Sequence, residues 1–113
     1  MQVQLCNIDS IPEGGSRAFE ISGHAGLFAI KKHGEIFLYL NCCPHLHVQL
    51  NWDPERFLNS TGDLIQCSTH GALFAIEDGE CLQGPCLGKY LKKIEYQVKN
   101  NILCLDVENL PQS

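Results

Sequence analysis

The sequence predicts an all-β fold in which short antiparallel strands pack as a sandwich or a barrel-like domain. Short apolar or alternating runs recur along the chain, as expected of strands. Turn residues separate these runs, including His33-Gly34, Asp78-Gly79 and Asn100-Asn101. The length of 113 residues suits one domain, and no linker or low-complexity stretch divides it. We therefore expect a single domain over residues 1–113.

The expected strands follow one another along most of the chain. They cover residues 1–8, 18–22, 26–32, 35–41, 63–67, 72–78, 91–100 and 102–109. Periodicity is lost over residues 41–62, which predicts a long loop with one helical turn at 53–59, where Asp53 can cap the turn and Pro54 can begin it. Residues 81–89 predict a second loop.

Two segments of the chain resemble each other. Residues 24–36 and 70–82 both contain the word Leu-Phe-Ala-Ile, followed by a turn and Gly-Glu. The copies differ before that word, because Cys67 precedes His70 by three residues whereas Ile21 stands in that place before His24. We interpret the likeness as two strands that converge on one pattern, and His24 is not expected to bind a metal.

Composition and charge exclude several classes of function. About 44% of the residues are hydrophobic and 19% are charged, which is typical of a globular protein. The net charge of −5 argues against binding to nucleic acid or to an anionic membrane. No run is long and apolar enough to span a bilayer, and the first residues lack the basic and apolar regions of a secretion signal. These observations predict a cytoplasmic protein, and we expect it to be a monomer.

Cysteine is abundant, with seven residues in the chain. An odd number without a secretion signal argues against a disulfide framework and favours metal binding. A disulfide or redox pair between Cys81 and Cys86 is a weaker alternative in a cytosolic protein. Cys6 and Cys104 alternate with polar neighbours and are expected to pack in the core.

Two short motifs carry the metal prediction. Cys43-x-His45 is followed by 21 residues and then by Cys67-x-x-His70, and each pair follows an expected strand. Four such ligands could hold a structural zinc ion, although zinc loops usually supply two Cys or two His from one loop. The alternative is a [2Fe–2S] cluster in which two His replace two Cys on one iron. In that arrangement each loop gives one Cys to one iron and one His to the other, which accounts for the spacing.

With these motifs the chain resembles the Rieske proteins, and among them the small Rieske-type ferredoxins. The likeness includes Cys43-Pro44-His45, the run from Cys67 to Phe74, the turn at Asp78-Gly79, and Gly84-Pro85 as a third loop. It implies a Rieske-type fold, in which an antiparallel base of residues 1–40 and about 75–113 carries a small cluster-binding part of about 41–74.

The resemblance also implies a site and its surroundings. One Rieske [2Fe–2S] cluster per chain would be held by Cys43, His45, Cys67 and His70. Cys42 is expected to pack as a small hydrophobic residue instead. Five further residues would surround the cluster: Leu46, His47, Gly71, Phe74 and Pro85. His47 is the oddity among them, since the family usually has glycine there.

The resemblance further predicts a low reduction potential. High-potential members carry an extra Cys in each cluster loop, at positions that correspond here to Val48 and Thr69. They also use a Ser and a Tyr hydroxyl to hydrogen-bond the cluster sulfurs, where this chain has Ala72 and Phe74. Fewer donors leave the reduced cluster less stabilised, so we expect a potential near about −150 mV.

The predicted function is therefore electron transfer rather than catalysis. The implied partners are redox proteins, namely a flavin-dependent reductase as donor and a terminal oxygenase or reductase as acceptor. One alternative is an electron-transfer subunit of a nitrite reductase-like complex. A structural zinc module is the alternative from a different class.

Overall fold

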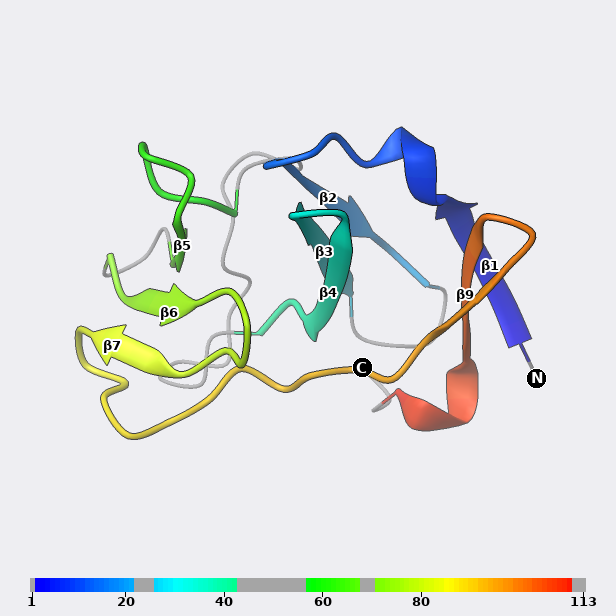
Figure 1. Cartoon of the computed structure of the whole chain (residues 1–113). Coiled ribbons are helices and arrows are strands. Elements are labelled where there is room, and N and C mark those ends of the chain that lie inside the picture. Colours follow the sequence, from blue (N-terminus) through cyan, green and yellow to red (C-terminus); the bar gives the residue numbers. More distant parts are fainter. Residues whose placement is uncertain (1, 22–25, 43–56, 68–70, 111–113) are drawn as a thin grey trace.

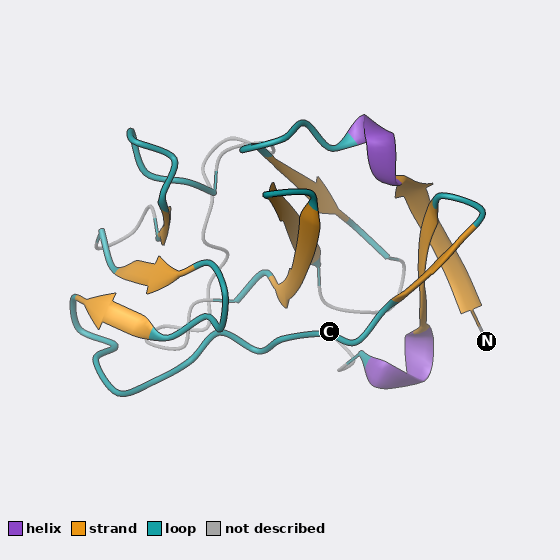
Figure 2. Cartoon of the chain, in the orientation of Figure 1, coloured by secondary structure: helices purple, strands orange, loops and turns teal. Residues whose placement is uncertain are grey.

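The computed structural model describes residues 2–21, 26–42, 57–67 and 71–110, and the chain in these ranges is built of short antiparallel strands (Figures 1 and 2). The strands form three sheets of three strands each, and no α-helix occurs in the described ranges. Two short 3₁₀ turns, η1 (Ile8–Ser10) and η2 (Val107–Asn109), are the helical elements there. No helix in this part of the chain has the length and apolar character needed to cross a bilayer. The predicted all-β class is confirmed.

The first sheet pairs the two ends of the sequence. Its order is β1-β9-β8, with β1 (Gln2–Asn7) against β9 (Ile102–Asp106) and β9 against β8 (Gln97–Lys99). Asn100 and Asn101 connect β8 to β9 with φ values of 52° and 64°. Asparagine tolerates this left-handed conformation, which matches the twist of a two-residue hairpin.

The second sheet has the order β2-β3-β4, with β2 (Ser16–Phe19), β3 (Leu27–Lys32) and β4 (Glu35–Leu40). His33 and Gly34 form the β3–β4 turn, both at positive φ. The Glu13 carboxylate accepts hydrogen bonds from the backbone N–H groups of His33 (2.6 Å) and Gly34 (2.8 Å). These two donors lower the pKa of Glu13.

The β3–β4 hairpin lies between two hydrophobic cores, which explains why its strands read as nearly continuous apolar runs. One face contributes Phe28, Ile30, Phe37 and Tyr39 to a core shared with the third sheet, which we call the loop-side core. The other face contributes Leu27, Ala29, Ile36 and Leu38 to a core shared with β9, which we call the terminal core. Figure 1 shows the second sheet between the other two sheets.

The third sheet has the order β5-β6-β7, with β5 (Leu64–Gln66), β6 (Leu73–Ala75) and β7 (Cys81–Gln83). Its inner face carries Ile65, Phe74 and Cys81, each at most 1% exposed, in the loop-side core. β7 lies in the stretch 81–89 that sequence reasoning assigned to loop. The error arose because Gly84 and Pro85 dominate that stretch, whereas Cys81 is fixed by pairing with Phe74 across the sheet.

The predicted strand over residues 91–100 is also shorter than expected. Only Gln97–Lys99 forms part of a sheet, as β8. The preceding residues cross between the third and first sheets. Two hydrogen bonds hold them to β4: the Leu40 N–H donates to the Lys92 carbonyl, and the Ile94 N–H donates to the Leu38 carbonyl. Leu91 and Ile94 are buried on this crossing, so the alternating pattern reflects contact with two different cores.

Candidate metal centre

The loop after β5 begins at Cys67 and is closed by two backbone hydrogen bonds. The Cys67 N–H donates to the Ala72 carbonyl, and the Gly71 N–H donates to the Cys67 carbonyl, each over 2.9 Å. Gly71 adopts φ +68°, a conformation that side chains disfavour, so glycine suits this position. The chain therefore turns back between Cys67 and Ala72, and the predicted ligand His70 lies outside the described residues.

The Cys67 side chain is fully buried, in the loop-side core. The structure brings Cys81 and Cys86 into the same core, both at most 1% exposed. Sequence reasoning treated Cys81 and Cys86 only as a possible pair. No local pattern marked Cys81 as inward-facing, because the adjacent apolar residue of β7, Leu82, is exposed.

The first predicted cluster loop leaves the end of β4. The Leu40 N–H donates to the Lys92 carbonyl and the Asn41 N–H to the Gly26 carbonyl, each over 2.9 Å. These bonds fix the root of the loop up to the half-buried Cys42. The predicted ligands Cys43 and His45, and the predicted neighbours Leu46 and His47, lie outside the described residues.

The third loop packs directly on the second. A Cβ atom at Gly84 would lie 2.9 Å from the Ala72 Cα and 3.0 Å from its Cβ, and Gly84 has φ +113°. Both features require glycine, because a side chain would collide with the backbone of Ala72. Pro85 is exposed, whereas the next residue, Cys86, is fully buried. Gly84 therefore sets the close approach of residues 84–86 to the Cys67–Ala72 turn.

Apolar and aromatic side chains pack around Cys67. Phe74 and Ala72, which were expected near the site, are at most 1% exposed in the same core. Phe28 stacks on Phe57 with ring centroids 4.3 Å apart. These side chains exclude water from the Cys67 side of the loop and lower the local dielectric constant.

Tyr39 ties the root of the first loop to the sheet that carries the second. Its hydroxyl donates to the Ile76 carbonyl over 2.5 Å, and its ring is fully buried. Burial raises the pKa of Tyr39 above its ordinary value, and the negative charges of Asp78 and Glu77 raise it further. Sequence reasoning missed this contact, because it joins residues that are 37 positions apart.

The chemistry of the residues fits an iron–sulfur group better than a hard metal ion. Thiolate is a soft ligand that suits Fe–S clusters or zinc, and Cys67 offers it within an apolar core. Among the described residues, no group of three or more His, Cys, Asp or Glu side chains forms a metal site by itself. Of the four predicted ligands, only Cys67 is among the described residues, and Cys43, His45 and His70 lie outside them.

Comparison with solved structures gives matches along nearly the whole chain. A ferredoxin from Sphingomonas yanoikuyae B1 is 25% identical, with a TM-score of 0.73 over 94% of this chain and 98% of that one. The ferredoxin of carbazole 1,9a-dioxygenase from Nocardioides aromaticivorans IC177 is 16% identical, with a TM-score of 0.72 over 100% and 99% of the chains.

A third structure is the complex of reduced oxygenase and oxidized ferredoxin in carbazole 1,9a-dioxygenase. One of its chains is 22% identical, with a TM-score of 0.73 over 91% of this chain and 90% of that one. At these lower identities the second and third likenesses establish the fold alone. None of the curated proteins compared with the sequence matches it.

The family described as Rieske [2Fe-2S] domain matches residues 1–106 of the sequence. This match covers both Cys-His motifs and the third loop, and the fold agrees with it over all three sheets. The cofactor of the domain is a [2Fe–2S] cluster. The chain therefore belongs to the family of Rieske [2Fe–2S] domain proteins.

Proposed function

We propose that this protein is a one-electron carrier of the Rieske ferredoxin type, with no catalytic residues of its own. The observation that supports this most strongly is the family match over residues 1–106, together with a ferredoxin that has the same fold over 98% of its length. When bound, the [2Fe–2S] cluster takes up and releases one electron. The task of the chain is to hold that group, exclude water from it and present it to a partner.

We assign the ligands as Cys43 and Cys67 on one iron and His45 and His70 on the other. The spacing of the two motifs supports the assignment, since each loop carries both residue types. The fully buried Cys67 supports it from the structure, because an inner iron needs a thiolate that is shielded from water. Cys42 is assigned a packing role. Residues about 41–74 would form the cluster-binding part of a single domain.

The surroundings support a low-potential centre, near about −150 mV. Ala72 and Phe74 are buried beside the Cys67 turn and have no hydroxyl group to donate to a sulfide. Without such donors the reduced cluster carries its extra negative charge with less compensation. Leu46 and Pro85 would shield the cluster, and His47 would lie at its rim.

The proposed partners are a flavin-dependent reductase as electron donor and an oxygenase as acceptor. The support for an oxygenase comes from solved ferredoxins of similar fold, one of them in a complex with its oxygenase. A soluble, monomeric shuttle located in the cytoplasm fits this role.

The ligand assignment is tested by replacing adjacent cysteines. Cys43→Ser should abolish cluster assembly, whereas Cys42→Ser, one residue away, should leave it intact. Anaerobic reconstitution with iron and sulfide, followed by metal analysis and visible absorption, measures the cluster content. The dithionite-reduced wild type should give an EPR spectrum of low average g, which is typical of mixed His and Cys ligation.

Two results would contradict the proposal. A colourless protein that holds one zinc ion per chain after expression in iron-rich medium would favour the structural zinc alternative. Loss of the cluster in Cys42→Ser but not in Cys43→Ser would overturn the choice of ligand. The same EPR sample, titrated with mediators, measures the potential, and a value well above 0 mV would contradict the argument from Ala72 and Phe74.

A further inference from the structure

The segment that contains the third loop exposes an unusual amount of apolar surface. In the described ranges four large hydrophobic side chains are exposed, and three of them lie here: Leu82 (48%), Leu87 (66%) and Tyr90 (56%). The fourth, Val98, lies on β8 in a different sheet. Leu82, Leu87 and Tyr90, with the exposed Lys89 and Lys92, are called the 82–92 strip below.

Strand register places the apolar members together. Tyr90 forms an antiparallel bridge with Glu80, and the Cys81 N–H donates to the Lys89 carbonyl. Cys81 points into the core, and Leu82 follows it at a register shift of β7 against β6 and is exposed to solvent. Leu87 lies in the turn that joins these paired segments. The three exposed apolar side chains therefore belong to two paired segments and the turn between them.

The 82–92 strip extends between the roots of the two cluster loops. Near one end, Gly84 packs on Ala72, the residue that closes the Cys67 turn. At the other end, the Lys92 carbonyl accepts from the N–H of Leu40, two residues before Cys42. A protein seated on the strip would thus lie beside both loops.

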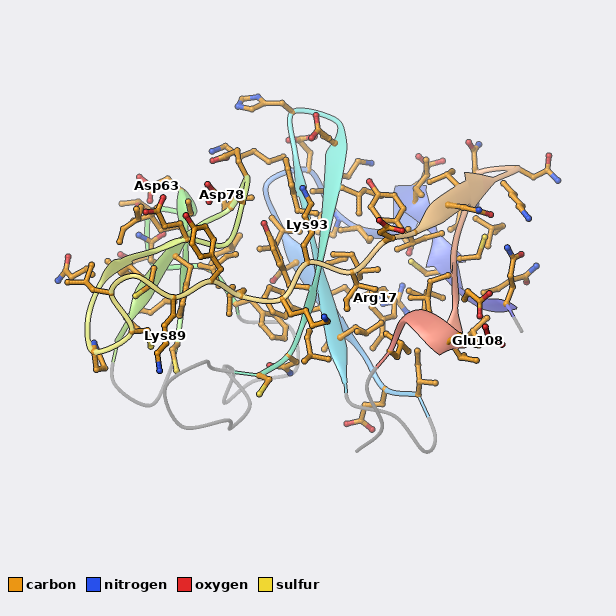
Figure 3. The ribbon with its side chains drawn as sticks, turned by 90° about the horizontal axis from the view of Figure 1, so that it is seen from below. Arg17, Asp63, Asp78, Lys89, Lys93 and Glu108 are labelled. Atoms are coloured by element: carbon orange, nitrogen blue, oxygen red, sulfur yellow. The ribbon has the colours of Figure 1, made fainter. Side chains whose placement is uncertain are left out.

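The local charge is opposite to that of the chain. Residues 81–93 contain Lys89, Lys92 and Lys93 and no Asp or Glu, although the whole chain carries −5; the nearest carboxylate in the sequence is Glu80, which pairs with Tyr90 at the edge of the strip. Lys93 is left out of the strip because its ammonium group already lies over the Phe37 ring, in a cation–π contact. Among the described residues, neither Lys89 nor Lys92 has a carboxylate within ion-pair distance. Figure 3 shows Lys89 on the opposite margin of the third sheet from Asp63 and Asp78.

We propose that the 82–92 strip is the docking surface for a redox partner protein whose contact surface has an apolar centre and carboxylates at its rim. The apolar side chains supply the contact area, and Lys89 and Lys92 attract and orient the acidic rim. This inference rests on the proposed function of electron carriage. In the docked pair one electron passes from the reduced protein to the acceptor. No bond forms or breaks, and no proton is transferred.

The sign of a salt effect tests the proposal with an acidic blue-copper protein as acceptor, in which the electron converts Cu(II) to Cu(I). Two proteins of net negative charge that meet without a specific patch react faster as salt is added, because repulsion is screened. Docking on the 82–92 strip predicts the reverse. The second-order rate constant, measured by stopped flow, should fall between about 20 mM and about 300 mM salt.

Matched variants locate the effect. Lys89→Glu should lower the rate constant at low salt by roughly tenfold, whereas Lys99→Glu, with the same change in net charge but on β8, should lower it less than about twofold. Leu87→Ser should lower the rate at every salt concentration by about threefold, and Val98→Ser should have no effect. Equal losses in the two members of a pair, or a wild-type rate that rises with salt, would overturn the proposal.

Two further measurements separate the possible reasons for failure. Oxidation by a small neutral quinone should be equal in all variants, and a protein that cannot reduce the quinone would contradict the proposed function. Backbone amide shifts on adding oxidized blue-copper protein should concentrate in residues 82–92, which tests docking without electron transfer. If sedimentation shows a dimer that Leu87→Ser dissociates, the strip is occupied by a second copy and the assignment is wrong.

Discussion

The word Leu-Phe-Ala-Ile occurs twice in this chain, and the two copies have different surroundings. In residues 27–30 all four side chains are at most 1% exposed, because β3 lies between two cores. In residues 73–76 only Phe74 and Ile76 are buried, and Leu73 and Ala75 are partly exposed. Both copies lie in the middle of a three-stranded sheet, so sheet position does not explain the difference. What differs is whether one face or both faces of the sheet are covered.

The comparison teaches that local sequence selects the strand, whereas tertiary packing decides how many faces are buried. The sheet that is buried on one face carries the Cys67 turn, and its strand β7 includes Leu82 of the 82–92 strip. The second sheet, which is covered on both faces, contributes side chains to both hydrophobic cores. Four substitutions, taken in order of decreasing expected effect, can break or sharpen this contrast.

The largest effect is expected from the same substitution in each copy. Ala29→Lys would bury an ammonium group in the terminal core and should reduce the free energy of unfolding by about 4 kcal/mol or more. Ala75→Lys points to the partly open face and should change it by less than about 1 kcal/mol. Urea denaturation followed by circular dichroism measures both. Equal destabilisation would show that the two words have equivalent surroundings after all.

A smaller effect is expected at Tyr39, which contacts both copies. Tyr39 pairs with Phe28 across β3–β4 and donates its hydroxyl to the Ile76 carbonyl. Tyr39→Phe keeps the ring but leaves that carbonyl without this donor, so it should cost about 1–3 kcal/mol. Calorimetric melting at neutral pH gives the value, and an unchanged melting temperature would contradict the role assigned to the hydroxyl.

The same substitution should change the response to alkaline pH. The pKa of Tyr39 is raised in the folded protein, chiefly by burial, so the unfolded chain loses its phenolic proton first. Its contribution is therefore fully present below about pH 10 and is lost as the pH rises above that value. The stability difference between the wild type and Tyr39→Phe should shrink in that range. A constant difference up to about pH 11 would contradict this prediction.

The smallest effect is expected at the contact between Lys32 and Glu77, which follow the two Leu-Phe-Ala-Ile segments in the sequence. Lys32 and Glu77 form an ion pair of 3.4 Å, with side chains that are 30% and 58% exposed. Water and salt screen such a pair, so Lys32→Met should change stability by less than about 0.5 kcal/mol. Chemical denaturation at low and high salt checks this. A loss above about 1 kcal/mol would mean that the pair, rather than the shared core, joins the two sheets.

Much of this architecture could be predicted from the sequence. The turns at His33-Gly34 and Asn100-Asn101 were correctly predicted, because two-residue hairpins need residues that accept positive φ. Strand β7 was missed, since three residues carry too little periodicity to stand out beside Gly84 and Pro85. The crossing at 91–94 was taken for a strand, because contact with two successive cores imitates alternation.

The site was predictable in its chemistry and less so in its surroundings. The spacing of the Cys-His motifs suggested the Rieske cluster, and the family match confirms that cofactor. The individual ligands stay a prediction. Contacts such as Tyr39 with Ile76, or Gly84 with Ala72, depend on the folding of distant segments against each other and leave no local pattern.

The pairing of β1 with β9 has a consequence for how the protein is made. Gln2 lies opposite Asp106, so the first sheet cannot close until more than a hundred residues have been synthesised. Such non-local pairing folds slowly, because the entropy of closing a long loop is lost before any contact compensates it. The β3–β4 and β5–β6 hairpins need only local contacts. On the ribosome, the hairpin that carries Cys67 can therefore form while the terminal core still lacks β9.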